Sequence, residues 1–598
     1  MTKARALALL MLAVFLATSF RQGWMRGGSD FPNYYTAAVL VGRRAPLRDY
    51  YDWTWFQRQM DFAGIRNQLG GYLPQTPLTM LPMVPLAGFR VQVAKRIWLA
   101  INLALLLSTL WMLARATGIR IEWIAILMFL GYGSLQSNFR LGQYYVFLLF
   151  LLTLVFSGLD RGKPTRSGFL CGLAFGLKLY GGPFLLYFAV KRNWKAVAGM
   201  AAASALALGA MITLFGWGDV HFYATQILPR SLAGEVIDPY DPGNGTLTTF
   251  LRHSLVLEPD LNPHPLANAP AAFFFLRTFT MLLLLGYTLF ALASEGREFS
   301  RRGFAWFTIA ILLASSNAAS YTYILLLLPV TVLLKQAGPK ERIFLAVSYV
   351  ALNFPLPAGS ERFFPKLWIL FAVYCVVGRY FWPALQPKLI AGGVAAAVIL
   401  ASVDAEKHLT RYRLEPNRHF QRFALDQGTY LSTYPIVTSA GLFYQAMVPS
   451  GYVLRWSHDG QMEEFAFGGQ VFDPVAPSFA GPVYFELIKD GAATNMMFDP
   501  RTRRAVPAVS APAFTPSAVA SPDGKWTAFE STGPGPKQIW LRDSASGQSR
   551  VAVGGDCNNS APAWETSNVL IFASDCGRGL GMPVLYRATI PYWSVHKE

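Results

Sequence analysis

The sequence predicts a multi-pass α-helical membrane protein that carries a smaller, all-β, propeller-like soluble domain at its C-terminal end. Of the 598 residues, 53% are hydrophobic and 14% are charged, whereas average proteins have about 25% charged residues. Apolar runs recur until about Ser402, and no later stretch approaches the roughly 20 residues that cross a membrane. We therefore expect a membrane domain at residues 1–404, a linker at 405–430 and a β domain at 431–598.

The net charge of +18 belongs entirely to the membrane part of the chain. Residues 1–404 contain 35 lysines and arginines against 17 acids, while residues 405–598 contain 17 of each. Binding of nucleic acid needs a basic soluble face, so the neutral tail argues against a nucleic-acid partner. The excess of basic residues instead fits loops whose charge follows membrane topology and contact with lipid head groups.

The first 20 residues have the form of a signal sequence, with a basic start and an apolar core. Ala17-Thr18-Ser19 is a poor cleavage site and further apolar runs follow, so we expect an uncleaved first helix. Because basic ends stay in the cytoplasm, Asp30 and the loop around it should lie on the outer side of a plasma or inner membrane.

Twelve further apolar runs follow, so the prediction is about 13 transmembrane helices. Since 13 is odd, the β domain should emerge opposite the N-terminus, on the periplasmic or extracellular side. The charges of the early loops leave open whether the first of these runs crosses the membrane or re-enters from one side. The runs lie at about 76–90, 97–114, 121–137, 143–158, 167–190, 195–216, 272–293, 304–316, 320–335, 342–357, 365–382 and 388–403.

Two long polar loops are expected on the outer side, at residues 21–75 and 218–270. The first contains nine tryptophan, tyrosine and phenylalanine residues from Trp24 to Phe56, which favours interfacial helices at the head groups. It also contains seven arginines and no lysine, so its guanidinium groups contact lipid or pair with a phosphate. Two such loops facing each other could enclose a site at the membrane surface.

The tail has the pattern of repeated strands. The turn and strand at 521–529 recur at 564–572, 43 residues later, with weaker echoes at 481–485 and 441–444. A period near 40 residues with several strands per repeat indicates a small or incomplete β-propeller.

The four cysteines divide into two pairs. Cys171 and Cys375 lie in apolar runs and are expected to be packing residues. Cys557 and Cys576 lie in the tail, without the CxxC or paired histidines of a zinc site, and we expect a disulfide across neighbouring strands. No Asp-x-Asp arrangement accompanies Asp30, so no metal and no cofactor are predicted.

Five motifs occur in an order that resembles family 87 of the glycosyltransferases, which are polytopic enzymes of the GT-C class. The resemblance covers roughly residues 1–335, and the β domain is similar to TolB-type propeller repeats through Ser521-Pro522-Asp523-Gly524-Lys525-Trp526. The chain has Leu73-Pro74-Gln75 where that family often has Tyr-Pro-Pro. The five motifs are Asp30-Phe31-Pro32-Asn33-Tyr34-Tyr35, Pro74-Gln75-Thr76-Pro77, Leu141-Gly142-Gln143-Tyr144, the stretch from Gly172 to Tyr180, and Gly243-Asn244-Gly245-Thr246-Leu247.

The resemblance implies a hexosyltransferase, with mannose as the expected sugar and a polyprenyl phosphate as its carrier. Asp30 would be the general base that deprotonates the acceptor, since a carboxylate within hydrogen-bond reach can serve this role. Its alternative is a helix cap or an arginine partner. Lys178, flanked by Leu177 and Leu179, would stabilise the leaving phosphate, and the alternative is snorkelling to the interface.

Other residues are weaker candidates for binding the donor phosphate or sugar, and for Asn244 a plain turn is the alternative. These candidates are Arg140, Gln143, Asn244, Arg252, Tyr34 and Tyr35.

The partners expected are the lipid-linked sugar donor, membrane lipids and an acceptor of glycan, lipid or protein nature, which the C-terminal domain is a candidate to hold. Two other classes of function remain open. One is a transporter or flippase for lipid-linked glycans, in which Lys178 and Arg140 would line a pathway. The other is a membrane-anchored propeller that acts as an interaction or sensing module.

Overall fold

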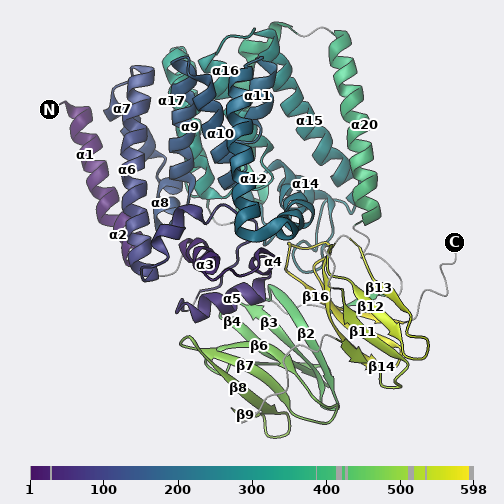
Figure 1. The fold of residues 1–598 in the computed structure, drawn as a ribbon. Helices are drawn as coiled ribbons and strands as arrows, with labels where there is room; N and C mark the ends of the chain where they lie inside the picture. Colours follow the sequence, from purple (N-terminus) through teal and green to yellow (C-terminus); the bar gives the residue numbers. More distant parts are fainter. Residues whose placement is uncertain are drawn as a thin grey trace.

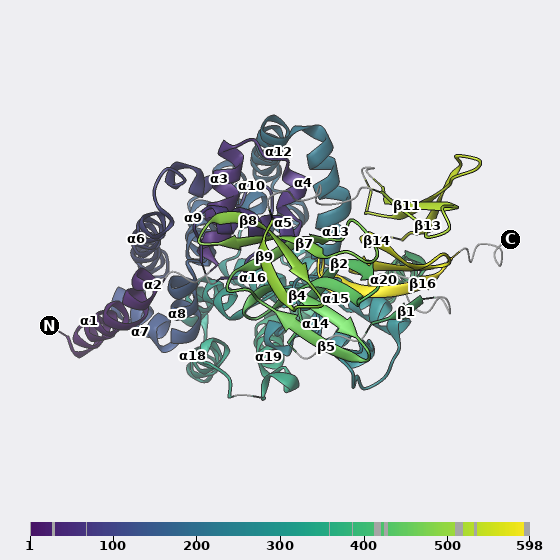
Figure 2. The ribbon, with the colours of Figure 1, turned by 90° about the horizontal axis from the view of Figure 1, so that it is seen from below.

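The computed structural model shows a bundle of helices standing against an all-β domain, with the N-terminus at the far end of the bundle (Figure 1). Viewed from the β side, the strand β7 (Val483–Lys489) lies next to the helix α5 (Trp53–Phe62) (Figure 2). The structure describes residues 2–26, 30–66, 68–357, 359–384, 387–411, 420–423, 428–508, 518–531, 535–555 and 557–590.

The helices differ widely in length, and several are short pieces joined by breaks. A π-helical turn at Leu16–Phe20 joins α1 to α2, and a 3-10 helix at Leu81–Leu86 precedes α6. The helices are α1 (Lys3–Phe15), α2 (Arg21–Met25), α3 (Phe31–Gly42), α4 (Leu47–Tyr50), α5 (Trp53–Phe62), α6 (Val91–Thr117), α7 (Ile121–Leu130), α8 (Tyr132–Leu141), α9 (Tyr145–Asp160), α10 (Pro164–Lys178), α11 (Phe184–Val190), α12 (Trp194–Phe222), α13 (Leu228–Leu232), α14 (Leu247–Leu255), α15 (Pro270–Ser294), α16 (Arg301–Ala314), α17 (Leu327–Gln336), α18 (Pro339–Asn353), α19 (Pro365–Gly378) and α20 (Pro387–Arg411).

The predicted number of 13 transmembrane helices is wrong. Among the described residues, five helical stretches are long and apolar enough to cross a membrane, or six if the bent pair of α8 and α9 forms one span. Apolar runs that looked like single spans are interrupted: the run at 121–137 breaks at Gly131, and the run at 167–190 breaks after Lys178. Hydropathy cannot locate these breaks, because the residues before and after a turn inside an apolar environment are equally apolar.

The loop charges left open whether the run at 76–90 crosses the membrane. In the structure, which describes all of this run, the only helix in it is the short 3-10 helix. Basic loops gather at the end of the bundle that holds the N-terminus (Figure 1). There Arg301 pairs with Asp160 at 2.6 Å and Lys191 pairs with Glu295 at 2.9 Å. The distribution of charge therefore agrees with the arrangement in which residues 76–90 do not cross.

Close packing of α10 on α12 fixes the depth of Lys178. Gly168, Gly172 and Gly176 recur every four residues along α10 and lie against Ala196, Ala203 and Ala207 of α12 in the same order, so the two helices run in parallel. A Cβ on Gly172 would lie 2.6 Å from the Cβ of Ala203. Small residues at this spacing let helix backbones approach closely. After Lys178 the chain turns and α11 runs back along α10.

In the part of the chain that the structure describes, the β domain contains four antiparallel, four-stranded sheets, as expected for a small propeller-like domain. The sheets contain β2 (Leu431–Thr438), β3 (Gly441–Val448), β4 (Gly451–His458) and β5 (Gln461–Phe465); β6 (Gln470–Val475), β7 (Val483–Lys489), β8 (Ala492–Asp499) and β9 (Arg504–Pro507); β10 (Ala518–Ala520), β11 (Trp526–Glu530), β12 (Ile539–Asp543) and β13 (Ser549–Val553); and β14 (Asn559–Thr566), β15 (Val569–Ser574) and β16 (Val584–Thr589) with β1 (Phe420–Arg422). The sheet of β2–β5 contacts the sheet of β6–β9 and the sheet that contains β14–β16. The latter also contacts the sheet of β10–β13.

The sequence repeat matches equivalent strands of the four sheets. β3, β7, β11 and β15 begin at residues 441, 483, 526 and 569, a spacing of 42 or 43 residues. The edge strand β1 of the last sheet comes from the segment 405–430, which was predicted to be a linker. Residues 412–419 and 424–427 of this segment lie outside the described part of the chain. The structure joins Cys557 and Cys576 in a disulfide, across the start of β14 and the end of β15.

Buried ion pairs hold the β domain on the membrane domain. Arg230 of α13 binds Glu235 at 2.7 Å and Asp575 at 3.0 Å. Arg578 binds Glu258 at 2.9 Å. Because these charges are buried and mutually paired, the two domains are expected to keep one relative placement.

Candidate active site

Asp30 lies at the start of α3, at the end of the bundle that faces the β domain (Figure 1). Its side chain makes no capping hydrogen bond to α3, so the cap alternative has no support in this geometry. Instead, its carboxylate accepts a hydrogen bond from the side-chain amide of Gln143.

A chain of hydrogen bonds continues from Gln143 to Lys178. The hydroxyl of Tyr34 donates to Oε1 of Gln143 at 2.8 Å, and the ammonium of Lys178 donates to the Tyr34 hydroxyl at 3.3 Å. Lys178 also donates to the side-chain carbonyl of Gln75. The chain thus connects a carboxylate at one end with an ammonium at the other through neutral side chains.

Local structure around Gly142 brings Gln143 to Asp30. Gly142 ends α8 in the left-handed region with φ 69°, and a Cβ there would lie 2.7 Å from the Cβ of Phe31. Only glycine permits this approach, because an L residue would meet both the backbone strain and the clash. The indole of Trp98 donates to the Gly142 carbonyl at 3.1 Å and fixes the turn.

The segment after Gln75 closes the C-terminal end of α10, where Lys178 is the last residue. The hydroxyl of Thr76 donates to the carbonyl of Gly176 at 2.6 Å, and that of Thr79 donates to the carbonyl of Leu177 at 2.7 Å. Helix ends leave carbonyls without partners within the helix, and these two threonines satisfy them. The side chain of Gln75 is thereby held beside Lys178.

Aromatic rings surround the ammonium of Lys178. It lies 5.1 Å from the ring centre of Tyr34, 5.8 Å from that of Tyr144 and 5.6 Å from that of Tyr145. Cations are stabilised over aromatic faces within about 6 Å, more strongly where water is excluded. This arrangement holds the ammonium at the site, so snorkelling to the interface does not describe Lys178.

Burial raises the pKa of the Asp30 carboxyl above its ordinary value of 3.8. The hydrogen bond from Gln143 and the positive charges of Lys178 and Lys95 lower the pKa and oppose this effect. A carboxylate with a raised pKa is a better proton acceptor, provided that it remains ionised. The environment of Asp30 therefore suits a general base.

The structure does not bring every predicted site residue to Asp30. The hydroxyl of Tyr35 donates to the carbonyl of Phe89 at 2.7 Å, in the wall of the loop. Arg252 is 4% exposed and donates to the carbonyl of Ala233 at 3.0 Å, so it stabilises its own loop. The side chain of Asn244 donates to the carbonyl of Asp238 at 3.1 Å, within the turn that was its alternative.

Arg140 is close to the site only through its backbone. Its carbonyl accepts from the ammonium of Lys95 at 3.2 Å, and its guanidinium makes no hydrogen bond or ion pair with any described residue. Lys95 was not predicted as a site residue, because it was considered only as one of the basic loop residues that indicate membrane topology. Gln75, Tyr144 and Tyr145 were missed as well, although Gln75 and Tyr144 lie within motifs that already pointed to the family. In the described part of the chain, no group of three His, Cys, Asp or Glu side chains is placed to hold a metal ion.

Comparison with known proteins finds similarity over part of the chain. Residues 72–316 match the sequence model of Glycosyltransferase family 87, a range that includes Gln75, Gln143 and Lys178 and leaves out Asp30 and Tyr34. A stretch of 167 residues is 32% identical to the polyprenol-phosphate-mannose-dependent alpha-(1-2)-phosphatidylinositol mannoside mannosyltransferase of Mycobacterium tuberculosis. That match covers 26% of this chain and 37% of the relative, so the chain spans little more than a third of the relative's length.

One solved structure is also similar, the crystal structure of TolB from Acinetobacter baumannii. It has 16% sequence identity and a TM-score of 0.14, over 26% of this chain and 43% of that chain. Over residues 72–316, the chain carries the sequence pattern of glycosyltransferase family 87.

Proposed function

We propose that the protein is a membrane glycosyltransferase. It moves a hexose, with mannose as the expected sugar, from a polyprenyl-phosphate donor to an acceptor hydroxyl at the outer face of the membrane. The observation that carries the proposal is the hydrogen-bonded chain from Asp30 through Gln143 and Tyr34 to Lys178, whose four members all lie on motifs that resemble the family. The relative from Mycobacterium tuberculosis, whose name specifies polyprenol-phosphate-mannose, supports the choice of donor.

The transfer has one proton and one leaving group to accommodate. The acceptor hydroxyl gives its proton to the Asp30 carboxylate, and its oxygen forms a new bond to the anomeric carbon of the sugar. The bond from this carbon to the phosphate oxygen breaks, and its electron pair stays on the polyprenyl phosphate. Attack opposite the leaving group inverts the anomeric configuration.

The residues of the site divide these tasks. Burial disfavours the charged form of Asp30, while the hydrogen bond from Gln143 and the positive charge of Lys178 favour it by lowering the pKa. The phosphate gains negative charge as it leaves, and the ammonium of Lys178 stabilises that charge. Gln143 and Tyr34 hold the carboxylate and the ammonium in one orientation. No metal ion is required for this division of roles.

The apolar helices support a location in a membrane, and the charges of the loops support the choice of which end faces the cytoplasm. The basic loops lie at the N-terminal end of the bundle, and the loops 21–75 and 218–270 lie at the other end with the β domain (Figure 1). By the positive-inside rule, the N-terminal end faces the cytoplasm. The site and the β domain then face the periplasm or the cell exterior.

The direct test is sugar transfer by the purified protein in lipid bilayers, with polyprenyl phosphates that carry labelled mannose, glucose or galactose. A labelled product with a new glycosidic bond is expected with at least one donor. The same preparation in sealed vesicles reports movement of the intact donor across the bilayer, which a transporter or flippase would catalyse. Movement of donor without any new glycosidic bond would replace the transferase by that alternative.

A further inference from the structure

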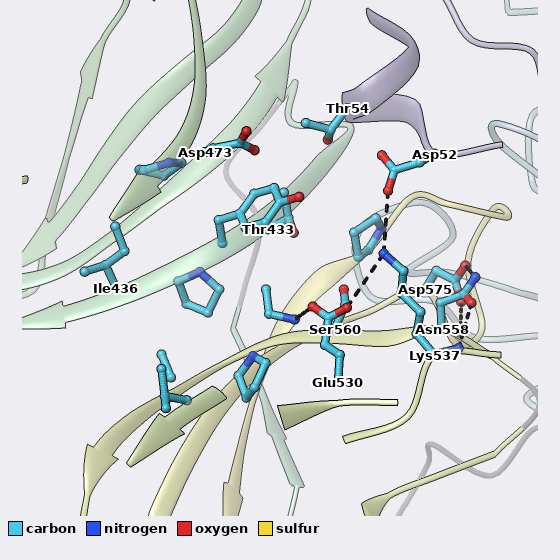
Figure 3. A pocket seen from close by; sticks show the side chains of 18 of the residues that line it. Asp52, Thr54, Thr433, Ile436, Asp473, Glu530, Lys537, Asn558, Ser560 and Asp575 are labelled. Atoms are coloured by element: carbon cyan, nitrogen blue, oxygen red, sulfur yellow. Dashed lines mark hydrogen bonds and ion pairs between the residues drawn. The ribbon is translucent and has the colours of Figure 1, made fainter. Parts of the chain in front are cut away.

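A cavity of about 1140 Å³ lies between the β domain and the first outer loop. The inner strands β2, β6, β10 and β14 form most of its wall, and residues 48–54 close it from the side of the membrane domain (Figure 3). None of the residues in the chain from Asp30 to Lys178 lines it, so this space is separate from the groups to which the reaction above assigns chemistry.

The inner strands share a bulge that opens this space. Tyr434, Asp473 and Ala561 each have a left-handed backbone, with φ of 50°, 47° and 51°, and each is followed by a proline. The strand pairing shifts at all three positions. Left-handed backbone costs roughly 1–2 kcal/mol at a residue other than glycine, and such strain gathers at functional sites. Its repetition in three sheets indicates that the centre of the domain is built to stay open.

The charges in the wall are already paired. Lys537 lies 3.6 Å from Asp52 and 3.8 Å from Glu530, as Figure 3 shows, and Arg48 pairs with Asp219 at 2.9 Å. An anionic ligand would therefore find no unpaired cation in the described part of the wall. Carboxylate oxygens remain as acceptors for hydroxyl groups.

An exposed aromatic ring lies in the same wall. Phe479 is 62% exposed although it lines the cavity, and the Ser439 amide donates to its carbonyl at 2.7 Å. A sugar ring offers a face of C–H groups to an aromatic ring and a rim of hydroxyls to carboxylates. The volume exceeds the range of about 300–1,000 Å³ that is usual for small-ligand pockets, so the cavity has room for several sugar units.

The cavity and the candidate active site share a wall. Tyr51 lines the cavity, and its hydroxyl donates to the backbone carbonyl of Gln75 at 3.0 Å. The side chain of Gln75 in turn accepts from Lys178. A ligand in the cavity is thus separated from the site by a single layer of residues.

We propose that this cavity binds a neutral oligosaccharide. This part of the proposal rests on the proposed transferase function: the oligosaccharide is the glycan part of the acceptor, which the β domain holds beside the wall that the cavity shares with the candidate active site. The carboxylates of Asp52 and Glu530 accept its hydroxyls, and Phe479 packs against a sugar face.

The test measures binding to the full-length protein in lipid nanodiscs. The probes are fluorescently labelled mannotetraose and maltotetraose, with labelled tetragalacturonate as an anionic counterpart of equal length. The variants are Phe479→Ala, Phe479→Trp and Asp52→Asn, which removes the charge but keeps a residue type that caps α5. The matched control is Phe363→Ala, because Phe363 is 64% exposed and does not line the cavity.

At least one neutral tetrasaccharide is expected to bind. Its Kd should rise tenfold or more in Phe479→Ala and in Asp52→Asn, stay near the parent value in Phe479→Trp, and be unchanged in Phe363→Ala. The proposal is overturned if neither neutral probe binds, if tetragalacturonate binds more tightly, or if the cavity variants bind like the parent. Sugar transfer is measured separately. If the cavity binds the neutral probe but no sugar is transferred, the proposed function is wrong and the binding site stands. If sugar is transferred but binding does not depend on the cavity, the binding site is wrong and the proposed function stands.

Discussion

At the scale of single residues, the site depends on a carboxylate whose proton affinity is set by few contacts. Burial of Asp30 raises its pKa, and the amide of Gln143 is the hydrogen-bond donor that opposes this rise. Tyr34 in turn orients Gln143 by donating to its carbonyl oxygen. Changes to these neighbours should therefore alter the pH dependence of transfer as well as its rate.

Replacement of Gln143 by leucine should shift the acidic limb of the pH profile. Loss of the amide raises the pKa of Asp30 further, so the carboxylate becomes protonated at a higher pH and activity falls there. We expect a shift of about one pH unit, measured as kcat/KM between pH 4 and pH 8. Gln136→Leu is the matched control, because Gln136 lies on α8, the helix that ends just before Gln143. Equal loss of rate at every pH would indicate a purely structural role for Gln143.

Asp61 predicts a pH dependence of stability. Burial raises its pKa to about 7, and it accepts hydrogen bonds from Gln57 at 3.1 Å and from Gln470 of the β domain at 3.0 Å. A pKa raised in the folded state contributes stability that is complete below about pH 4 and is lost as the pH rises through about 7.

Asp61→Asn should remove this loss, because the amide stays neutral. Relative to the parent protein, the variant should gain about 1–3 kcal/mol at pH 8.5 and little at pH 5. Thermal unfolding in detergent at the two pH values measures the difference. A pH dependence equal in both proteins would show that Asp61 is not the titrating group.

At the scale of elements, α10 carries Lys178 to the site, and its packing on α12 determines where that lysine lies. Gly168 and Gly172 of α10 leave no space for a side chain: a Cβ on Gly168 would clash with the carbonyl oxygen of Ala196, and one on Gly172 would lie 2.8 Å from that of Met200. The position of Lys178 is thus a property of the helix pair as much as of the lysine.

Gly172→Leu should separate α10 from α12 and displace Lys178. We expect transfer to fall at least tenfold and stability to drop by roughly 1–3 kcal/mol, as for other overpacked cores. Gly209→Leu is the control, because a Cβ on Gly209 of α12 meets nothing within 4 Å. Steady-state rates and thermal unfolding of both variants give the comparison. If Gly172→Leu behaves like Gly209→Leu, tight packing does not position the site.

The sequence predicted some elements of the site and missed others for physical reasons. Four polar residues that lie among apolar ones were predicted as site residues, since polar groups are costly in such surroundings unless they have partners. The structure brings these residues together: Asp30, Tyr34, Gln143 and Lys178. Arg252 was also predicted, yet the structure holds it within its own loop, where it donates to the carbonyl of Ala233.

Other features depend on contacts between distant parts of the chain. The number of spans was overestimated because hydropathy does not report where a chain reverses. The cavity of the β domain escaped prediction entirely, since it arises where strands of four sheets and the first outer loop converge. The repeat of about 43 residues, by contrast, was visible because each sheet reuses the same strand pattern.

At the scale of the whole molecule, the β domain is held against the outer loops by ion pairs that differ in burial. The pairs of Arg230 with Glu235 and Asp575 are buried, with side chains 6% exposed or less. The pair of Arg66 with Asp490, at 3.1 Å, has side chains 63% and 59% exposed. Buried and exposed pairs of the same chemistry have very different consequences when broken.

Arg230→Met should loosen the β domain, because it removes the cation that pairs with two buried carboxylates, Glu235 and Asp575. A loss of roughly 3–5 kcal/mol is expected for a broken buried pair, whereas Arg66→Met should cost less than about 1 kcal/mol. Thermal unfolding and the rate of limited proteolysis of the β domain report the change. Equal behaviour of the two variants would contradict a fixed placement of the domains.

The central claim is that the Asp30 carboxylate accepts the proton of the acceptor hydroxyl. It is tested most directly by transfer of labelled mannose from polyprenyl phosphate by Asp30→Asn, with binding of the same donor measured in parallel. Asp490→Asn, an exposed carboxylate in the turn after β7, is the control. Asp30→Asn should lower kcat by about 10²–10⁴-fold while donor binding changes less than threefold, and Asp490→Asn should match the parent. Transfer by Asp30→Asn at the parent rate would contradict the account.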